Sequence, residues 1–96
     1  MAYQGYASGD PDKDAFSIRL FAQHEIPLFL AQSFAKNCGM YGERVGALSI
    51  LCESAKNAKN IQSQLAFIAR RLYSNPPLFG QRVVSTILSN PKIYKI

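Results

Sequence analysis

The sequence predicts an α/β chain, in which two short strands enclose a loop and amphipathic helices make up most of the rest. Two apolar runs, at residues 27–31 and 45–52, are short and flanked by turn residues, a pattern typical of buried strands. Between residues 58 and 72, apolar residues recur at three- and four-residue steps, which indicates a helix with one buried face. Capping and helix-breaking residues mark where the other helices begin and end.

The first helix is expected at residues 11–25. Asp10 is a good N-cap and Pro11 suits the first helical position, with acidic residues following in the first turn. The helix should end before Pro27, because the residue that precedes a proline disfavours the helical conformation. Ahead of this helix, residues 1–4 are expected to form the end of a strand that leads into a glycine-containing loop.

The two strands are expected at residues 27–33 and 45–52. Their connection, about residues 34–44, is too short for a helical crossover, so the strands should be antiparallel neighbours. Three glycines would let the backbone turn tightly in and after this connection: Gly39, Gly42 and Gly46.

Two further helices are expected, at residues 54–73 and 78–89. Ser54 is the N-cap with which the first of them begins, and Arg70 and Arg71 lie in its last turn, where cations complement the negative end of the helix dipole. The sequence Ser-Asn-Pro-Pro separates the two helices, and Asn-Pro ends the second. Residues 93–94 should begin one more element.

Composition restricts the possible functions of the chain. It has 96 residues, at most one domain, and its 48% hydrophobic content is that of a globular protein. The net charge of +5 suits either nucleic acid or small anionic ligands. Because the cations are scattered along the sequence, we expect an anionic cofactor and acidic substrates, and no nucleic acid. No apolar run approaches the roughly 20 residues of a membrane span, so no membrane partner is expected.

Cysteine usage bears on the compartment and on metal binding. Cys38 and Cys52 have neither metal-binding nor redox spacing, which predicts free thiols in a reducing compartment and no metal site. Met1 is followed by a polar, glycine-rich stretch without the pattern of a signal peptide. We therefore expect an intracellular protein of the cytoplasm, with the mitochondrial matrix as the alternative.

The candidate site lies in the predicted connection between the strands. Lys36 follows a buried strand closely, so desolvation would favour the neutral, nucleophilic amine. Ser33 and Arg44 bracket it with a hydroxyl and a planar guanidinium, which suit a phosphate or another oxyanion. A nucleophilic amine beside a phosphate site is what pyridoxal phosphate requires. The spacing alone leaves two alternatives open, a solvated surface lysine and the Ser-x-x-Lys motif of serine β-lactamases and penicillin-binding proteins.

The longer stretch at residues 33–46 reads Ser-Phe-Ala-Lys-Asn-Cys-Gly-Met-Tyr-Gly-Glu-Arg-Val-Gly and resembles the cofactor-lysine region of aspartate aminotransferases. Tyr-Gln-Gly-Tyr-Ala-Ser-Gly at residues 3–9 resembles the family's upstream segment, and Tyr-Ser-Asn-Pro-Pro at residues 73–77 its downstream segment. The resemblance implies that residues 1–96 are part of the large, cofactor-binding domain of a fold type I pyridoxal-phosphate enzyme, without a complete second domain. Since such enzymes are several times longer, we expect an internal part of a longer chain.

The resemblance also implies a role for each site residue. Lys36 would form the Schiff base with the cofactor and move the proton at the substrate's α carbon. Tyr3 would donate a hydrogen bond to the cofactor's ring hydroxyl oxygen, and Ser33 and Arg44 would bind its phosphate. Arg70 would reach across a homodimer to the side-chain carboxylate of the substrate.

Small departures from the family pattern occur within the quoted segments. Tyr6 and Met40 stand where Phe and Leu are common, and Cys38 occupies a variable position. None of these departures removes a chemical group that the family's reaction uses.

The expected function is therefore that of a pyridoxal-phosphate-dependent aspartate aminotransferase, which exchanges the amino group between L-aspartate and 2-oxoglutarate. The enzyme would be a homodimer with shared active sites, and the 96-residue chain alone should be inactive. The alternative is a catalytically dead, aminotransferase-derived module that binds other proteins. A Ser-x-x-Lys acyl-enzyme is disfavoured, because that chemistry needs a serine that opens a helix and partner motifs that the sequence lacks.

Overall fold

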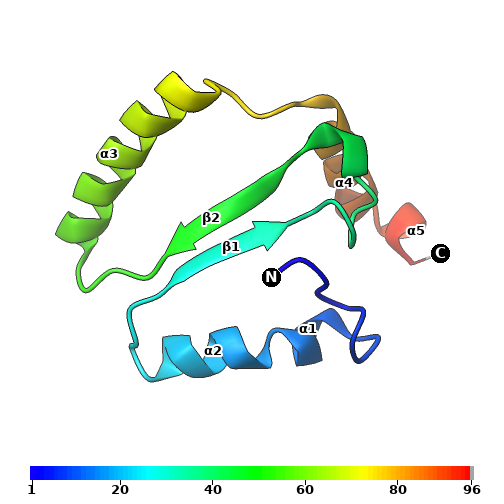
Figure 1. Ribbon diagram of the computed structural model, residues 1–96. Coiled ribbons are helices and arrows are strands. Elements are labelled where there is room, and N and C mark those ends of the chain that lie inside the picture. The colour runs from blue at the N-terminus through cyan, green and yellow to red at the C-terminus, as the bar shows by residue number, and fades with distance from the viewer. Residues whose placement is uncertain (96) are drawn as a thin grey trace.

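The computed structural model describes residues 1–95 and contains one two-stranded sheet with helices on both sides of it (Figure 1). Its elements in chain order are α1 (Pro11–Asp14), α2 (Phe16–Gln23), β1 (Phe29–Ser33), the 3-10 helix η1 (Tyr41–Glu43), β2 (Gly46–Ile50), α3 (Ala55–Leu72), α4 (Phe79–Ser89) and α5 (Pro91–Tyr94). This mixture of helices and a sheet confirms the predicted α/β class.

The sheet is antiparallel, as the short connection predicts. β1 and β2 pair from Phe29 opposite Ile50 to Ser33 opposite Gly46. Both strands are shorter than the predicted ranges 27–33 and 45–52. Single backbone hydrogen bonds continue the pairing beyond each end, from Phe34 to Val45 and from Leu51 to Leu28. The predicted strands were therefore correctly placed and too long by the residues that lie outside the regular ladder.

The predicted strand at residues 1–4 is not formed. Met1 nevertheless lies along the free edge of β1, where its N–H donates to the Ala31 carbonyl and its carbonyl accepts the Ser33 N–H. These two bonds, to residues on either side of Gln32, are those of a parallel neighbour. One residue is too short for a strand, but the contact brings the N-terminal loop next to the end of β1.

The prediction of one continuous helix at residues 11–25 was wrong. The chain forms two helices, α1 and α2, divided at Ala15, whose ψ of 3° is outside the helical range. Ala15 is buried, with 8% of its surface exposed. The second helix ends early because Glu25 turns the backbone into the left-handed region at φ 52°.

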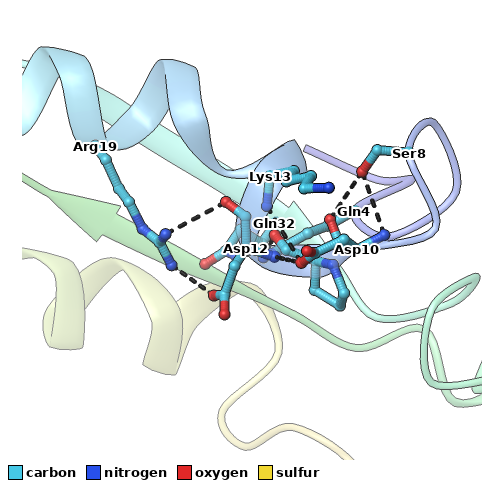
Figure 2. Close-up of polar contacts among 8 residues, drawn as sticks. Gln4, Ser8, Asp10, Asp12, Lys13, Arg19 and Gln32 are labelled. Atoms are coloured by element: carbon cyan, nitrogen blue, oxygen red, sulfur yellow. Dashed lines mark hydrogen bonds and ion pairs between the residues drawn. The ribbon is translucent and has the colours of Figure 1, made fainter.

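Local capping starts the first helix as the sequence predicts. The Asp10 carboxylate accepts the N–H groups of Asp12 and Lys13, and Pro11 occupies the first helical position (Figure 2). The figure also shows Arg19 of α2 paired with Asp12 of α1, at 2.6 Å between Nη2 and Oδ1. Because both side chains of this pair are exposed, its contribution to stability is small.

The later helices confirm their predicted ranges closely. Ser54 caps α3 as predicted, by accepting the N–H of Asn57 at 3.1 Å, and the helix itself begins at Ala55. α4 occupies nearly the predicted range 78–89, and Asn90 ends it and caps the short helix α5. A further element was expected to begin at residues 93–94, and α5 begins earlier, at Pro91.

The apolar faces of these elements are largely uncovered. The accessible surface is 7835 Å², whereas a compact monomer of 10.7 kDa would expose roughly 5,500 Å². Among residues 1–95, α3 has no buried residue, and Leu72 on its predicted buried face is 75% exposed. The buried apolar side chains of the described chain are Ala15, Ala35 and Met40. Two of these three lie in the loop between β1 and β2, so the best-packed part of the structure is the candidate site.

No helix within residues 1–95 combines the length and apolar character needed to cross a bilayer.

Candidate active site

The loop at residues 34–44 leaves the end of β1 and returns at the start of β2. Because Ser33 pairs with Gly46 in the last rung of the sheet, the two ends of the loop lie side by side. A cavity of about 190 Å³ opens at this point. Its lining residues are Gln32, Ser33, Ala35, Arg44, Val45 and Gly46. The structure thus brings together Ser33 and Arg44, which the sequence predicts as phosphate ligands.

Gly46 is required for this close approach. A Cβ at position 46 would lie 2.2 Å from the backbone carbonyl oxygen of Gln32 on the neighbouring strand. A backbone atom in a ladder cannot move aside as a flexible side chain does. Any larger residue would therefore separate the two strands at the cavity.

The donors at the cavity fit a phosphate group. The Ser33 hydroxyl oxygen accepts the Ala35 N–H at 3.3 Å, so its own O–H remains free to donate. Arg44 donates from Nη1 to the Tyr41 carbonyl at 3.2 Å, and a guanidinium has further N–H donors for a second acceptor. At about 30 Å³ for each water, the cavity has room for a group of several heavy atoms.

A larger cavity, of about 420 Å³, lies at the opposite end of the sheet. It is lined by Ala22, Glu25, Pro27, Leu51, Cys52 and Glu53. Two carboxylates and no cation among these residues make it unsuitable for a phosphate or a dicarboxylic acid. Charge therefore favours the smaller cavity as the candidate site.

Lys36 lies one residue beyond the cavity lining and is half-buried. Its Nζ is 4.1 Å from the centroid of the Tyr41 ring, within the range of a cation–π contact. Its backbone carbonyl accepts a hydrogen bond from the Tyr6 hydroxyl at 3.2 Å. Two tyrosines therefore hold the lysine, Tyr6 at its backbone and Tyr41 at its side chain. The sequence predicted a desolvated lysine at the end of a buried strand, whereas among residues 1–95 Lys36 is only half-buried.

Tyr3 reaches the lysine loop through Tyr6. The two rings make an edge-to-face contact, with centroids 6.1 Å apart, and Tyr6 then bonds to Lys36. Tyr3 is 60% exposed, and its hydroxyl makes no hydrogen bond to another described residue. The hydroxyl can therefore donate to a ligand. Tyr6 was missed as a site residue, because a contact between positions 30 apart has no local signal.

Arg70 stands apart from the other predicted site residues. It is exposed in the last turn of α3, and within the described residues it makes no ion pair with an acid. Arg71 instead places its guanidinium 4.1 Å from the centroid of the Phe67 ring. Residues 1–95 therefore do not bring Arg70 to Lys36, and its role across a dimer stays a prediction.

Glu43 and Gly80 are further residues that the sequence did not single out. The Glu43 carboxylate accepts the Gly80 N–H at 3.1 Å, which joins the lysine loop to α4. Cys38 and Cys52 are both free and half-buried. Across the described residues, no three acidic, histidine or cysteine side chains gather as a metal site would require.

Comparison with known proteins agrees with this geometry. The profile of the family "Aminotransferase class I and II" matches residues 1–95. The mitochondrial aspartate aminotransferase of Arabidopsis thaliana is 56% identical over 93 residues, which are 97% of this chain and 22% of that relative. The chain thus spans about a fifth of the length of this relative.

Solved structures give the same result for the fold. A variant of the mitochondrial aspartate aminotransferase of Trypanosoma brucei superimposes with a TM-score of 0.90 at 50% identity, over 99% of this chain and 25% of that one. The aromatic-amino-acid aminotransferase of Burkholderia pseudomallei, covalently bound to pyridoxal phosphate, gives 0.90 at 41% identity, over 98% and 23%. With a family profile over residues 1–95 and relatives this similar in sequence and fold, the chain belongs to the aminotransferase class I and II family.

Proposed function

We propose that this chain is the cofactor-lysine segment of a pyridoxal-phosphate-dependent aspartate aminotransferase, within its large, cofactor-binding domain and without a complete second domain. The observation that carries the proposal is the loop that places Lys36 beside a cavity lined by Ser33 and Arg44. The covalent pyridoxal phosphate of the Burkholderia relative supports the cofactor. Aspartate is supported by the names of the Arabidopsis and Trypanosoma relatives, which are the more identical ones.

Each site residue then has a defined task. The Ser33 hydroxyl and the Arg44 guanidinium would donate hydrogen bonds to the phosphate, and Lys36 Nζ would hold the cofactor at its aldehyde carbon. Pyridoxal phosphate supplies an aldehyde that takes up amino groups and a ring that withdraws electrons from the substrate. The free Lys36 amine would carry the proton that leaves the substrate's α carbon. The Tyr3 hydroxyl would donate to the cofactor's ring oxygen and stabilise its anionic form.

The substrates and the partner follow from Arg70. A planar guanidinium matches a carboxylate with two hydrogen bonds, so an arginine at the substrate's side chain selects dicarboxylic acids. Arg70 is exposed on α3 and distant from the Lys36 loop in sequence, which fits an arginine that serves the site of a second subunit. We therefore propose a homodimer with shared active sites that uses L-aspartate and 2-oxoglutarate.

The proposed compartment is the mitochondrial matrix. The Arabidopsis and Trypanosoma relatives are both named as mitochondrial proteins, which agrees with this alternative and does not confirm the cytoplasm. Free Cys38 and Cys52 fit either compartment.

The competing function, a catalytically dead module that binds other proteins, has no observation in its favour. Such a module would have no need to keep the reactive groups of the site. Lys36, Ser33, Arg44 and Tyr3 are all retained, and the first three are gathered at one end of the sheet. The enzyme is therefore the better explanation.

The test uses an aminotransferase of full length that carries residues 1–96, for example the Arabidopsis relative with its matching segment replaced, called the full-length protein below. It should transfer the amino group of aspartate to 2-oxoglutarate. Lys36→Ala should lower kcat by at least about 1,000-fold, because both the covalent and the proton-transfer roles are lost. Lys59→Ala, on the exposed side of α3, is the control and should keep the rate. A Lys36→Ala variant with normal turnover would refute the proposal.

A further inference from the structure

A charge-assisted contact joins the lysine loop to the start of α4. The Glu43 carboxylate accepts the N–H of Gly80, 37 residues away, at 3.1 Å between Oε2 and N. This N–H belongs to the first turn of α4, where backbone donors have no partner within the helix, and the N-cap residue Leu78 provides no side-chain acceptor. A carboxylate there also meets the positive end of the helix dipole. Glu43 therefore caps α4 from another part of the chain.

The contact is packed as well as hydrogen-bonded. Gly80 is buried, and a Cβ at this position would lie 2.7 Å from Met40 Sδ and 2.8 Å from Glu43 Cγ. Met40 is itself buried, with 9% of its surface exposed. Two side chains of the lysine loop thus rest directly on the Gly80 backbone, and only glycine leaves room for them.

The same turn determines where Arg44 lies. Arg44 follows Glu43 directly and adopts the left-handed conformation, with φ 52° and ψ 47°. A residue other than glycine keeps such a conformation only where the surrounding structure holds it. The Arg44 side chain folds back over η1, where Nη1 donates to the Tyr41 carbonyl at 3.2 Å. Fixing η1 at Glu43 therefore fixes both the backbone and the side chain of Arg44.

We propose that Glu43 and Gly80 are positioning residues for the cofactor site. Their contact holds η1 in the conformation that presents Arg44 to the phosphate, so the start of α4 supports phosphate binding without touching the ligand. This inference rests on the proposed function, because the phosphate that Arg44 would bind is that of pyridoxal phosphate.

The test measures the Kd for pyridoxal phosphate on the full-length protein after removal of its cofactor. Glu43→Ala should raise the Kd about tenfold, and Glu43→Gln about threefold, since the amide keeps an acceptor and loses the charge. Gly80→Ala should match Glu43→Ala. Two controls should change the Kd by less than about twofold. They are Glu53→Ala, at an exposed carboxylate elsewhere, and Gly42→Ala, whose Cβ would meet no atom within 4 Å.

Two further readouts separate positioning from mere capping. Hydrogen exchange in the first turn of α4 should accelerate in Glu43→Ala and Gly80→Ala, and kcat at saturating cofactor should stay within about twofold in both. In an Arg44→Ala background, Glu43→Ala should raise the Kd by less than about twofold more, because its effect passes through Arg44. If Glu43→Ala does not fold, Glu43→Gln, which retains the shape of the side chain, takes its place in these measurements.

The possible failures can be told apart. If Glu43→Ala accelerates exchange and leaves the Kd unchanged, the contact only caps α4 and the positioning role is wrong. If the effects of the Glu43 and Arg44 substitutions on the free energy of pyridoxal phosphate binding are fully additive, Glu43 does not act through Arg44 and the inference is likewise wrong. If the unsubstituted full-length protein does not bind pyridoxal phosphate, the proposed function itself is refuted, and the inference with it.

Discussion

Arg70 and Arg71 are neighbours in the last turn of α3, and their surroundings differ. Arg71 lies against the Phe67 ring one turn earlier, a contact that occupies the face of its guanidinium. No such contact holds Arg70 among the described residues. Their side chains leave the helix about 100° apart, so only one of them can point into a neighbouring subunit's site.

This difference predicts opposite effects on specificity. In the full-length protein, Arg70→Ala should weaken kcat/KM for aspartate by roughly 3 kcal/mol, or about 100-fold, because a substrate carboxylate is left desolvated and unpaired. Activity toward alanine, which has no side-chain carboxylate, should fall far less. Arg71→Ala should alter neither. If Arg71→Ala instead collapses the aspartate-to-alanine ratio, the assignment is displaced by one residue.

Asp14 holds the loop that carries Tyr6. Its carboxylate accepts the Ser8 hydroxyl at 2.7 Å and the N–H groups of Gly5, Ala7 and Ser8. The hydrogen bond from the Ser8 hydroxyl, together with those from the backbone, lowers the pKa of Asp14 below its ordinary value. A lowered folded-state pKa stabilises the fold above the unfolded-state pKa, and this stabilisation is lost as the pH falls through the folded-state value.

The expected consequence is a component of acid sensitivity that depends on one carboxylate. Between roughly pH 5 and pH 2, the Tm of the full-length protein should fall further than the Tm of Asp14→Asn, which has no proton to take up. Asp12→Asn, at an exposed ion pair, is the matched control and should follow the unsubstituted curve. Identical pH curves for the unsubstituted protein and Asp14→Asn would contradict this role.

At the scale of the element, the sequence was most informative where the deciding interaction is local. The caps at Asp10 and Ser54 depend on side chains within three residues of the groups they satisfy, and both start helices as the sequence predicts. Asn90, which was predicted only to end a helix, also caps α5. The antiparallel pairing followed from the length of one loop. By contrast, the contacts of Glu43 and Tyr6 join positions 37 and 30 apart, and no local pattern predicts them.

The candidate site shows the same limit. Ser33 ends β1, and Lys36 and Arg44 lie on the short loop that follows, so their proximity could be predicted from the sequence. The contribution of Tyr6 to the site could not be predicted, because the hydroxyl that distinguishes it from Phe has its hydrogen-bond partner in a distant segment. Arg70 is assigned to substrate binding only by resemblance to the family, since no contact among residues 1–95 places it at the site.

The close approach of Gly46 to the Gln32 carbonyl provides a test of the pairing between β1 and β2. Gly46→Ala would bring a Cβ within 2.2 Å of the Gln32 carbonyl oxygen and should destabilise the full-length protein by roughly 1–3 kcal/mol, measured by urea unfolding. Gly42→Ala, four positions earlier, adds a Cβ in open space and should change stability by less than about 0.5 kcal/mol. Equal losses of stability in the two variants would show that the pairing of Ser33 with Gly46 does not restrict position 46 to glycine.

The whole molecule is open and poor in buried apolar groups. The radius of gyration is 15.4 Å, whereas a compact domain of this length would have roughly 12.5 Å. Large apolar side chains such as Phe29, Phe79 and Leu72 are more than 70% exposed, at 77%, 76% and 75%. Large apolar side chains exposed on three different elements fit a chain that further polypeptide covers.

The isolated chain should therefore be marginally stable and inactive. Residues 1–96 produced alone are expected to bind an apolar dye, to unfold at low urea concentration and to show no amino transfer from aspartate, because the carboxylate-binding partner subunit is absent. Circular dichroism, dye fluorescence and a coupled assay would measure these properties. Steady turnover by the isolated chain would contradict the proposal that the site is shared.

The central claim is that Lys36 is the lysine that holds pyridoxal phosphate, and covalent trapping tests it most directly. Borohydride reduces the bond between the cofactor's aldehyde carbon and a lysine to a stable amine, which remains through proteolysis and can be located by mass spectrometry. In the full-length protein we predict one modified peptide, with the phosphopyridoxyl group on Lys36, and none in Lys36→Ala. A group trapped on another lysine, or at an undiminished level in Lys36→Ala, would contradict the account.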